Sequence, residues 1–520
     1  MKRFPWHILW IALFPVVFLY AENTSVVEMK DVWLPLIYSI LGASAILGVS
    51  YLLFRDLRKA AVMASLIVLL FFSYGAYHDA LFPKRILTFI GKGIRFDHNF
   101  YKWSSLFLIL LIGWRLFKLK KDIPKFTSLL NMITFVLFGF SAFNVIQAKA
   151  NRPSNEVTHS VEEISVELDS NAEYPSIYYI ILDAYGREDI LREMYDFDNS
   201  PFTDFLKDRG FFVADGATSN YGQTILSVPS ALNMNYLDSM SEVYGEDYTE
   251  REPLMHYLRE NKTLRFLKSL GYESVAYDAS IFGLAHLNTA DHFFETPGTD
   301  INLFMNELIN TTAIRAFNGR KPIKTLDNVE HHRKKINAAF DHMERIASKP
   351  GPLYVHGHVL TPHQPFVFNA DGSRRDMDYE YTIWAPMESL KMNEEEYKDG
   401  YLNQLQYVNT RVMQLVDSIL QNSVRKPVII LQGDHGPASE LHNINGFDNN
   451  DFRERLSILN AYYFPDGDYS MLSDTITPIN SFRVLRNKFF EGNYELLPDK
   501  AFYSNWNYPY RFHDVTDSIR

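Results

Sequence analysis

The first 147 residues contain a series of apolar runs, most of them long enough to cross a lipid bilayer. A helix needs roughly 20 apolar residues to span the hydrocarbon core. Lipid offers the backbone no hydrogen-bond partners, so such runs must fold as helices. We therefore predict a transmembrane domain over residues 1–147 with about five spans, which are Trp6–Ala21, Trp33–Phe54, Ala61–Leu81, Trp103–Leu119 and Phe126–Ile146.

The basic residues between these runs predict their orientation. Clusters at Lys2–Arg3, Arg55–Lys59 and Arg115–Lys125 fall on one side of the membrane if the amino terminus is cytoplasmic, as the positive-inside rule favours. The segment Lys84–Lys102 is contrary evidence, because it is also basic and would face outward. With five spans, everything after about residue 148 lies outside the cytoplasm, so we expect a multi-pass cell-membrane protein with a periplasmic or extracellular domain.

A cleaved signal peptide is an alternative interpretation of the first apolar run. It is disfavoured, because Leu19–Ala21 is a poor cleavage site and more apolar runs follow.

The two parts of the chain differ in charge. Residues 1–147 carry 16 Lys and Arg against 7 Asp and Glu, a net charge of +9, and the remainder of the chain carries −20. An acidic domain is not drawn to nucleic acid or to anionic lipid by charge. We therefore expect no nucleic-acid partner.

The chain has no cysteine. Disulfides, a cysteine nucleophile and cysteine metal sites are therefore excluded. An outer domain without disulfides needs a large apolar core, which a segment of about 370 residues can supply.

Residues 148–174 are polar and contain Pro, Ser and several Glu, which indicates a linker. From residue 175 to 520, apolar runs of strand type alternate with helical patterns. This alternation predicts an α/β domain with a parallel sheet covered by helices on both faces. The expected strands are Ser176–Leu182, Ser274–Tyr277, Leu353–His356, Val428–Leu431 and Ala461–Phe464, and the expected helices are Pro253–Leu270, Leu326–Ala347 and Glu395–Gln421.

Two of the expected strands end in side chains that can bind a metal ion. Asp183 follows Ser176–Leu182, and Asp434 and His435 follow Val428–Leu431 within the sequence Gly-Asp-His-Gly. In open α/β sheets, ligands bind at the carboxyl ends of the strands. Asp and His are common ligands of zinc and manganese. The alternative is that these residues are only polar strand ends.

Thr224 stands where a polar loop, which begins at Ser219, leads into an apolar helical pattern that runs to Asn233. A hydroxyl there would lie near the positive end of the helix dipole, which favours an alkoxide or a bound phosphate. A metal ion would activate it further as a nucleophile. The alternative is that Thr224 is only a helix cap.

This order of residues resembles the alkaline phosphatase and sulfatase superfamily, and within it the lipoteichoic acid synthases and phosphoethanolamine transferases. The resemblance implies a bundle of five membrane helices, a linker and an extracytoplasmic sulfatase-like α/β/α domain. It assigns Asp183, Asp434, His435 and the oxygen of Thr224 to the metal, and makes Thr224 the nucleophile. The sequence departs from those enzymes in having Asp183 where they use Glu, and in lacking cysteines. A single acid at this position favours one metal ion over two.

A histidine-rich segment, His356–Phe366, follows the third expected strand. The resemblance to a family histidine before a Pro-aromatic pair suggests that His363 contacts the phosphate or the head group, with His358 beside it. His356 is expected to remain within the strand. Histidines after a strand are also common as structural hydrogen-bonding residues, so both readings stay open.

Ser227 is a rival nucleophile. The sequence Ser227-Val-Pro-Ser-Ala231 resembles the sulfatase maturation motif Ser-x-Pro-x-Arg, but Ala231 replaces the arginine. With Ser227 as nucleophile the protein would be a formylglycine sulfatase. We prefer Thr224 because the motif is broken.

Several other features are not assigned to the catalytic site. His331 and His332 lie in a charged helical pattern and are expected at the solvated surface. The insertion at residues 371–390 is a candidate lid or acceptor site. Arg453 and Arg455 are expected to pair with nearby acids, although they are also candidates for meeting an anion.

The expected activity is a metal-dependent transfer of a phospho-head group, phosphoglycerol or phosphoethanolamine. The donor is a membrane phospholipid, the acceptor is a cell-surface glycan or glycolipid, and a phospho-threonine is the intermediate. One divalent ion is expected, manganese or zinc in preference to calcium, with magnesium as an alternative. The competing hypotheses are a sulfatase or phosphodiesterase that passes the group to water, and a non-enzymatic membrane protein for binding or assembly.

Overall fold

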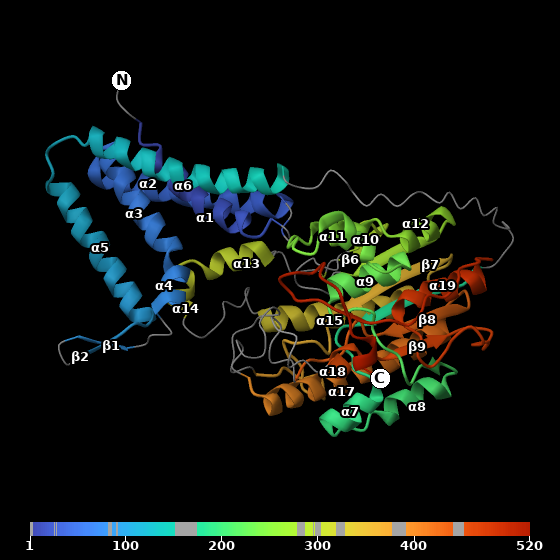
Figure 1. Ribbon diagram of the computed structural model, residues 1–520. Coiled ribbons are helices and arrows are strands. Elements are labelled where there is room, and N and C mark those ends of the chain that lie inside the picture. Colours follow the sequence, from blue (N-terminus) through green and yellow to red (C-terminus); the bar gives the residue numbers. More distant parts are fainter. Residues whose placement is uncertain are drawn as a thin grey trace. The chain divides into compact units, whose positions relative to one another are not determined.

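The computed structural model describes residues 4–24, 27, 29–81, 86–89, 92–150, 174–277, 287–294, 296, 303–318, 328–376, 392–439 and 452–519. The chain forms two compact units (Figure 1). One comprises Met1–Arg152 with Thr299–Asp327, and the other comprises Pro153–Gly298 with Asn328–Arg520. Most of the expected linker, residues 151–173, lies outside the described residues. The domain boundaries expected from the sequence stay a prediction.

In the first unit all five apolar runs are helical. The helices are α1 (His7–Ala21), α2 (Met29–Phe54), α3 (Leu57–Phe72), α4 (Tyr74–Leu81), α5 (His98–Lys118) and α6 (Pro124–Ala150), and a short hairpin pairs β1 (Ile86–Phe89) with β2 (Lys92–Arg95). The run expected at Ala61–Leu81 is divided at Ser73, where α3 ends and α4 begins. Three described helices, Met29–Phe54, His98–Lys118 and Pro124–Ala148, are long and apolar enough to cross a membrane. The number of spans stays a prediction.

The first unit also contains two short helices from much later in the chain, α13 (Leu303–Asn310) and α14 (Ile314–Asn318). Phe304 and Leu308 of α13 pack in one apolar cluster with Tyr20 of α1 and Val32 of α2. The backbone N–H of Ala313 donates to the carbonyl of Phe71, 2.7 Å away. Residues inside the outer-domain sequence are therefore part of the packing of the apolar helices.

The second unit is built on a seven-stranded sheet with the order β4-β9-β8-β3-β7-β5-β6. The strands are β3 (Ser176–Leu182), β4 (Phe212–Val213), β5 (Glu273–Tyr277), β6 (His292–Phe294), β7 (Leu353–Val359), β8 (Pro427–Gln432) and β9 (Asn460–Tyr463), and a separate pair joins β10 (Phe502–Tyr503) to β11 (His513–Asp514). Strands β8, β3, β7, β5 and β6 are mutually parallel. β9 runs antiparallel to β8, so the expected strand at Ala461–Phe464 reverses the direction that a wholly parallel sheet requires.

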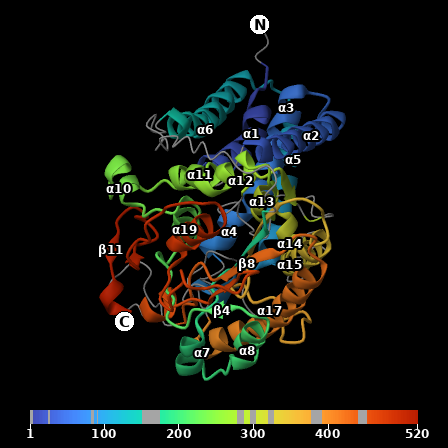
Figure 2. The ribbon, with the colours of Figure 1, turned by 90° about the vertical axis from the view of Figure 1, so that its right-hand side faces the viewer.

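Two apolar cores lie on opposite faces of this sheet, because successive strand side chains alternate between faces. One core joins Tyr178, Ile180 and Leu182 of β3 to α7 (Glu188–Tyr195), α8 (Ser200–Asp208), α15 (Asn328–Ile346) and α17 (Glu394–Asn422). The other joins Ile177, Tyr179 and Ile181 to α9 (Thr224–Asn233), α11 (Glu252–Arg259), α12 (Lys262–Ser269) and α19 (Pro478–Phe489). Figures 1 and 2 show these helices on both sides of the sheet, so the expected α/β/α arrangement is confirmed.

Helices α10 (Asp238–Tyr244) and α18 (Phe452–Leu456) and a short 3-10 turn (Thr516–Ser518) complete the described elements of this unit. The single helix expected at Pro253–Leu270 is divided, because Asn261 caps α12 by accepting from the backbone N–H of Leu264. The surface position expected for His332 is wrong. His332 is fully buried, because it lies one turn before the buried Ile336 on the face of α15 that packs against the core.

Candidate active site

The topology brings the predicted site residues to one edge of the sheet. β3 lies between β7 and β8 and runs parallel to both. Asp183 follows β3, His358 is near the end of β7, and Asp434 follows β8. The carboxyl ends of three neighbouring strands therefore meet at one place, as expected for a binding site in an open α/β sheet.

Two buried carboxylates, those of Asp183 and Asp434, lie together at this edge of the sheet. Asp183 and Asp434 are both almost completely buried. Oδ1 of Asp434 accepts from the backbone N–H of Ala184 at 3.2 Å. Oδ1 of Asp183 and Oδ2 of Asp434 have no hydrogen-bond partner among the described residues. Burying a carboxylate oxygen without a hydrogen-bond donor costs folding free energy. A bound cation would offset that cost.

The ring of His435 is oriented so that one nitrogen faces these carboxylates. Nδ1 lies 3.0 Å from the carbonyl oxygen of Gly436, which only accepts, so Nδ1 carries the proton. Nε2 then lies 3.5 Å from Oδ1 of Asp183 and 3.4 Å from Oδ2 of Asp434. Burial, together with the nearby Arg455, lowers the pKa of His435 to about 4. A neutral imidazole with a free Nε2 is the form that binds a metal ion.

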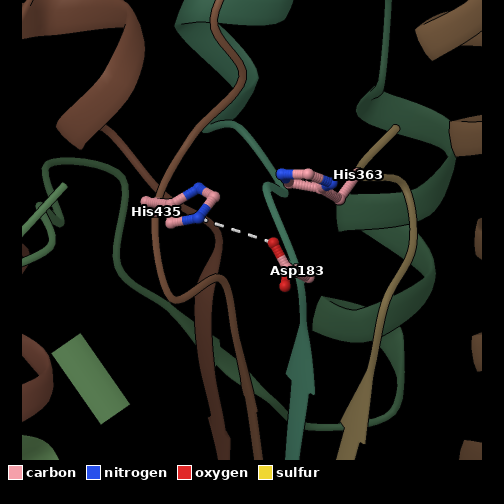
Figure 3. A group of neighbouring side chains, drawn as sticks. All are labelled: Asp183, His363 and His435. Atoms are coloured by element: carbon pink, nitrogen blue, oxygen red, sulfur yellow. Dashed lines mark ion pairs between the residues drawn. The ribbon is translucent and has the colours of Figure 1, made fainter. Parts of the chain in front are cut away.

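Two further histidines surround Asp183. Nε2 of His358 lies 3.2 Å from Oδ2 of Asp183. Burial lowers the pKa of His358, but its hydrogen bond to Asp183 and the negative charges of both aspartates outweigh burial and raise it. The backbone N–H of His363 donates to the carbonyl of Asp183 at 3.0 Å. Figure 3 shows the Asp183 carboxylate between the rings of His363 and His435, whose centroids are 5.9 Å apart.

The histidines also control the charge of Asp183. Burial alone would raise the pKa of this carboxyl group. The neighbouring His363, His358 and His435 outweigh burial and hold the pKa well below its usual range. Asp183 is therefore ionised and available as a ligand.

Thr224 lies beside this cluster, at the first residue of α9. Its Oγ1 is 3.3 Å from Nε2 of His435. The capping position belongs to Gln223, so the alternative that Thr224 is the helix cap is not supported. Thr224 is half-buried and its hydroxyl faces the carboxylate cluster through His435.

Ser227, the rival nucleophile, lies one turn deeper. It is buried, and its Oγ is 3.2 Å from Oγ of Ser219. Ser219 in turn donates to the carbonyl of Asp434. Ser227 thus belongs to the hydrogen bonds behind the site, whereas Thr224 stands at its surface.

The donor set fits a divalent cation. Two overlapping groups each place their ligand atoms within 4.8 Å of one another, namely Asp183, His363 and His435, and Asp183, His358 and Asp434. The two carboxylate oxygens without donors belong to these groups. Nitrogen and oxygen donors of this kind suit zinc and manganese. His358 and His363, predicted as substrate-binding residues, are therefore also close enough to act as ligands.

A family model described as sulfatase matches residues 175–477, which is more than half of the chain. The chain belongs to the sulfatase family. The match covers the seven-stranded sheet and every predicted site residue. The predicted superfamily is confirmed, and with it an enzyme of the class that acts on phosphate or sulfate esters. A search of curated proteins found no match.

Solved structures similar to this sulfatase-family chain include enzymes of two kinds. The C-terminal periplasmic domain of EptC from Escherichia coli, in complex with zinc, aligns with a TM-score of 0.44 and 12% identity, over 68% of this chain and 95% of that one. Lipooligosaccharide phosphoethanolamine transferase A from Neisseria meningitidis aligns at 0.40 and 12%, over 93% and 95%. Phosphonate monoester hydrolase of Agrobacterium radiobacter aligns at 0.42 and 11%, over 63% and 80%. Because all three TM-scores are below 0.5, the family assignment rests on the family match.

Arg455 also lies at this site of the sulfatase-family domain, although the sequence predicts that it pairs with a nearby acid. Its neighbour Arg453 forms ion pairs with Glu193 and Asp189, so the ion-pair reading holds for Arg453. The guanidinium of Arg455 instead donates to the carbonyls of Gly222 and Gly436. Residues two apart on a helix point to nearly opposite sides. That spacing is the signal that only one of the two could face the site.

Proposed function

We propose that this chain transfers a phosphate-linked head group from a membrane phospholipid to a glycan or glycolipid, with Thr224 as the nucleophile. The observation that carries the proposal is the position of the Thr224 hydroxyl. It lies at the amino terminus of α9 and 3.3 Å from Nε2 of His435, at the rim of a cluster of buried carboxylates whose oxygens Oδ1 of Asp183 and Oδ2 of Asp434 have no hydrogen-bond donor among the described residues. This is the arrangement expected for an activated hydroxyl nucleophile beside a metal site.

The first half-reaction forms a phosphodiester bond on the protein. Oγ1 of Thr224 attacks the phosphorus of the lipid, the bond between phosphorus and the diacylglycerol oxygen breaks, and diacylglycerol leaves with a proton. The proton of the threonine hydroxyl is lost to solvent or to a basic group at the site. The amino terminus of α9 presents backbone N–H groups and a positive dipole to the phosphate. Phospho-Thr224 carrying the head group is the product.

The histidines at the site have separate roles in this scheme. His435 and the two aspartates would hold a divalent ion, with the oxygen of Thr224 completing the set. Such an ion, when bound, supplies charge neutralisation and lowers the pKa of a coordinated hydroxyl. His363, which is half-buried, gives a proton to the departing diacylglycerol oxygen and later takes one from the acceptor hydroxyl. His358 holds Asp183 in place through its hydrogen bond.

The second half-reaction returns the enzyme to its starting state. A hydroxyl of the acceptor attacks the phosphorus of phospho-Thr224 and gives its proton to His363, the bond from phosphorus to Oγ1 breaks, and Oγ1 regains from solvent or the basic group the proton that it lost in the first half-reaction. Transfer to water instead of a glycan would make the protein a hydrolase. Manganese or zinc is the proposed ion, with magnesium as an alternative.

The test is intact-mass analysis of the purified full-length chain after incubation with fluorescent phosphatidylglycerol or phosphatidylethanolamine. We expect a mass increase at Thr224 equal to the phospho-head group, together with released diacylglycerol. Thr224→Ala should abolish both, and Ser227→Ala should leave a measurable rate. The reverse pattern, with activity lost only at Ser227, would refute the assignment.

A labelled head group distinguishes a transferase from a hydrolase. Recovery of the label on an added glycan or glycolipid supports transfer, and recovery in solution indicates hydrolysis. A non-enzymatic protein predicts no adduct, and no effect of Asp434→Ala on any phenotype of the cell.

A further inference from the structure

Arg455 lies where the loop of the nucleophile meets the loop of the predicted metal ligands. It belongs to the short helix α18, Phe452–Leu456. Its Nε donates to the carbonyl of Gly222 at 2.8 Å, and its Nη1 donates to the carbonyl of Gly436 at 3.0 Å. Gly222 is two residues before Thr224, and Gly436 directly follows His435. One side chain therefore joins the two segments whose relative position sets the distance from Thr224 to His435.

The backbone of α18, from which the side chain of Arg455 extends to these carbonyls, is held in place by its neighbours. Glu454 is fully buried and accepts from the hydroxyls of Tyr195 and Ser439. The backbone N–H of Gly436 donates to the carbonyl of Arg455 at 2.7 Å. A Cβ added to Gly436 would lie 2.2 Å from the carbonyl oxygen of Glu454, so α18 and Gly436 are in direct backbone contact.

The carbonyl of Gly436 is shared between two donors. It accepts from Nη1 of Arg455 and from Nδ1 of His435. A carbonyl oxygen has two lone pairs and can accept both. The bond from Arg455 fixes this carbonyl, and the fixed carbonyl holds the proton of His435 on Nδ1. The lone pair of Nε2 is then directed at Thr224 and the carboxylates.

We propose that Arg455 is a positioning residue of the reaction, which holds Oγ1 of Thr224 3.3 Å from Nε2 of the proposed metal ligand His435 by bracing Gly222 and Gly436. This inference rests on the proposed role of Thr224. It requires arginine, because a guanidinium presents several N–H groups in a rigid plane. The ammonium of lysine is a point charge and cannot hold two carbonyls in the same fixed geometry.

The test compares Arg455→Lys, Arg455→Ala and the matched control Arg453→Ala in the full-length chain purified in detergent. Arg453 is on the same helix but pairs with Glu193 and Asp189 away from the site. The substrates are fluorescent phosphatidylglycerol and phosphatidylethanolamine. Because a displacement of about 1 Å at a reacting centre costs about 100-fold in rate, we expect both Arg455 variants to lose about that much kcat with KM changed less than about threefold. Arg453→Ala should keep the wild-type kcat.

Two comparisons separate bracing from charge and from general damage to the fold. Guanidinium ions, added at millimolar concentration, should partly restore kcat to Arg455→Ala, whereas methylammonium should not. Bound manganese or zinc should be unchanged in Arg455→Lys. If Arg455→Lys retains the wild-type kcat, or methylammonium rescues as well as guanidinium, the bracing role is overturned and only charge matters.

Failure of the wider proposal would look different. If wild type gives no mass increase at Thr224, or Thr224→Ala retains turnover, the proposed function fails whatever the Arg455 variants do. If wild type forms the adduct and Arg455→Lys forms it at an equal rate in a single turnover, the function stands and the inference on Arg455 fails.

Discussion

At the scale of single residues, the site depends on which side chains are charged. Asp183 is held ionised by its histidine neighbours, and His435 is held neutral by burial. These are the states that bind a cation. We predict that Asp434→Asn and His435→Ala each weaken the binding of manganese or zinc at least about tenfold. Metal content after dialysis, measured by mass spectrometry, checks this. Asp417→Asn, a half-buried acid of α17 that pairs with Arg209, is the control, and equal metal loss in that variant would contradict the assignment.

His356 is a buried histidine that is not among the proposed metal ligands. It lies within β7, as expected from the sequence, and neither ring nitrogen has a hydrogen-bond partner among the described residues. Burial, with a smaller contribution from the charge of His358, lowers its pKa from 6.5 to about 3. The folded state therefore binds the proton more weakly than the unfolded state. The stability that this difference provides is complete above pH 6.5 and is lost as the pH falls toward 3.

The measurable consequence is a change in acid sensitivity. His356→Leu removes the titrating group, so we expect the variant to be more stable than wild type at pH 5 by about 2 kcal/mol. The advantage should shrink toward pH 7. Thermal or urea unfolding of the metal-free protein across this range measures it. An unchanged slope in His356→Leu would refute the account.

At the scale of elements, the glycines around Asp434 and His435 let the chain pass close to other backbone. A Cβ on Gly436 would lie 2.2 Å from the carbonyl oxygen of Glu454 and 2.9 Å from that of Ser457, so backbone would have to move. We predict that Gly436→Ala destabilises the fold by about 2 kcal/mol and lowers kcat more than about tenfold. At Gly222 the nearest contact is 3.4 Å, to the Cγ of Arg455, so Gly222→Ala should be tolerated. Unfolding curves and initial rates of both variants compare them, and equal effects would contradict the steric argument.

The elements that hold the site were predictable because their sequences are unambiguous. The run Ser176–Leu182 coincides with β3, and the strand that contains His356 and the strand that precedes Asp434 are near their expected places. Apolar runs bounded by polar residues favour buried strands. The acids at their ends then follow from the geometry of a parallel sheet. Thr224 was found because a polar loop precedes a helical pattern.

The elements that were missed depend on contacts distant in sequence. The strands β4 and β6 have two and three residues and no pattern of their own. β9 is antiparallel, and nothing in an apolar run encodes the direction of a strand. His332 is buried and Arg455 is half-buried by what packs against their helices, which the charged patterns around them do not reveal.

At the scale of the whole molecule, the packing of α13 and α14 bears on the membrane topology. These helices are within the sequence of the outer part, yet they contact one end of the apolar helices. Phe304 and Leu308 pack beside Tyr20, at the carboxyl end of α1, and beside Val32, near the amino terminus of α2. Ala313 bonds to Phe71 at the carboxyl end of α3. We predict that those helix ends lie on the same side of the membrane as the outer part of the chain.

The opposite helix ends carry the basic residues. Arg58 at the start of α3 pairs with Asp122, which lies between α5 and α6. The positive-inside rule favours a cytoplasmic position for that end, so we predict that the end that contacts α13 faces outward. Both arguments give the same orientation, although the basic segment at Lys84–Lys102 then also faces outward.

Because the chain has no cysteine, single cysteines report this orientation without background. We predict that Ala80→Cys, an exposed residue of α4, reacts with a membrane-impermeant maleimide in intact cells or spheroplasts. Lys120→Cys, between α5 and α6, should react only after the membrane is permeabilised, because charged loops on the cytoplasmic side are shielded from the reagent. Asp198→Cys, in the sulfatase-family domain, should behave like Ala80→Cys. If Ala80→Cys and Asp198→Cys react from opposite sides, α13 and α14 cannot pack as described in a membrane, and both the orientation and the count of five spans would be wrong.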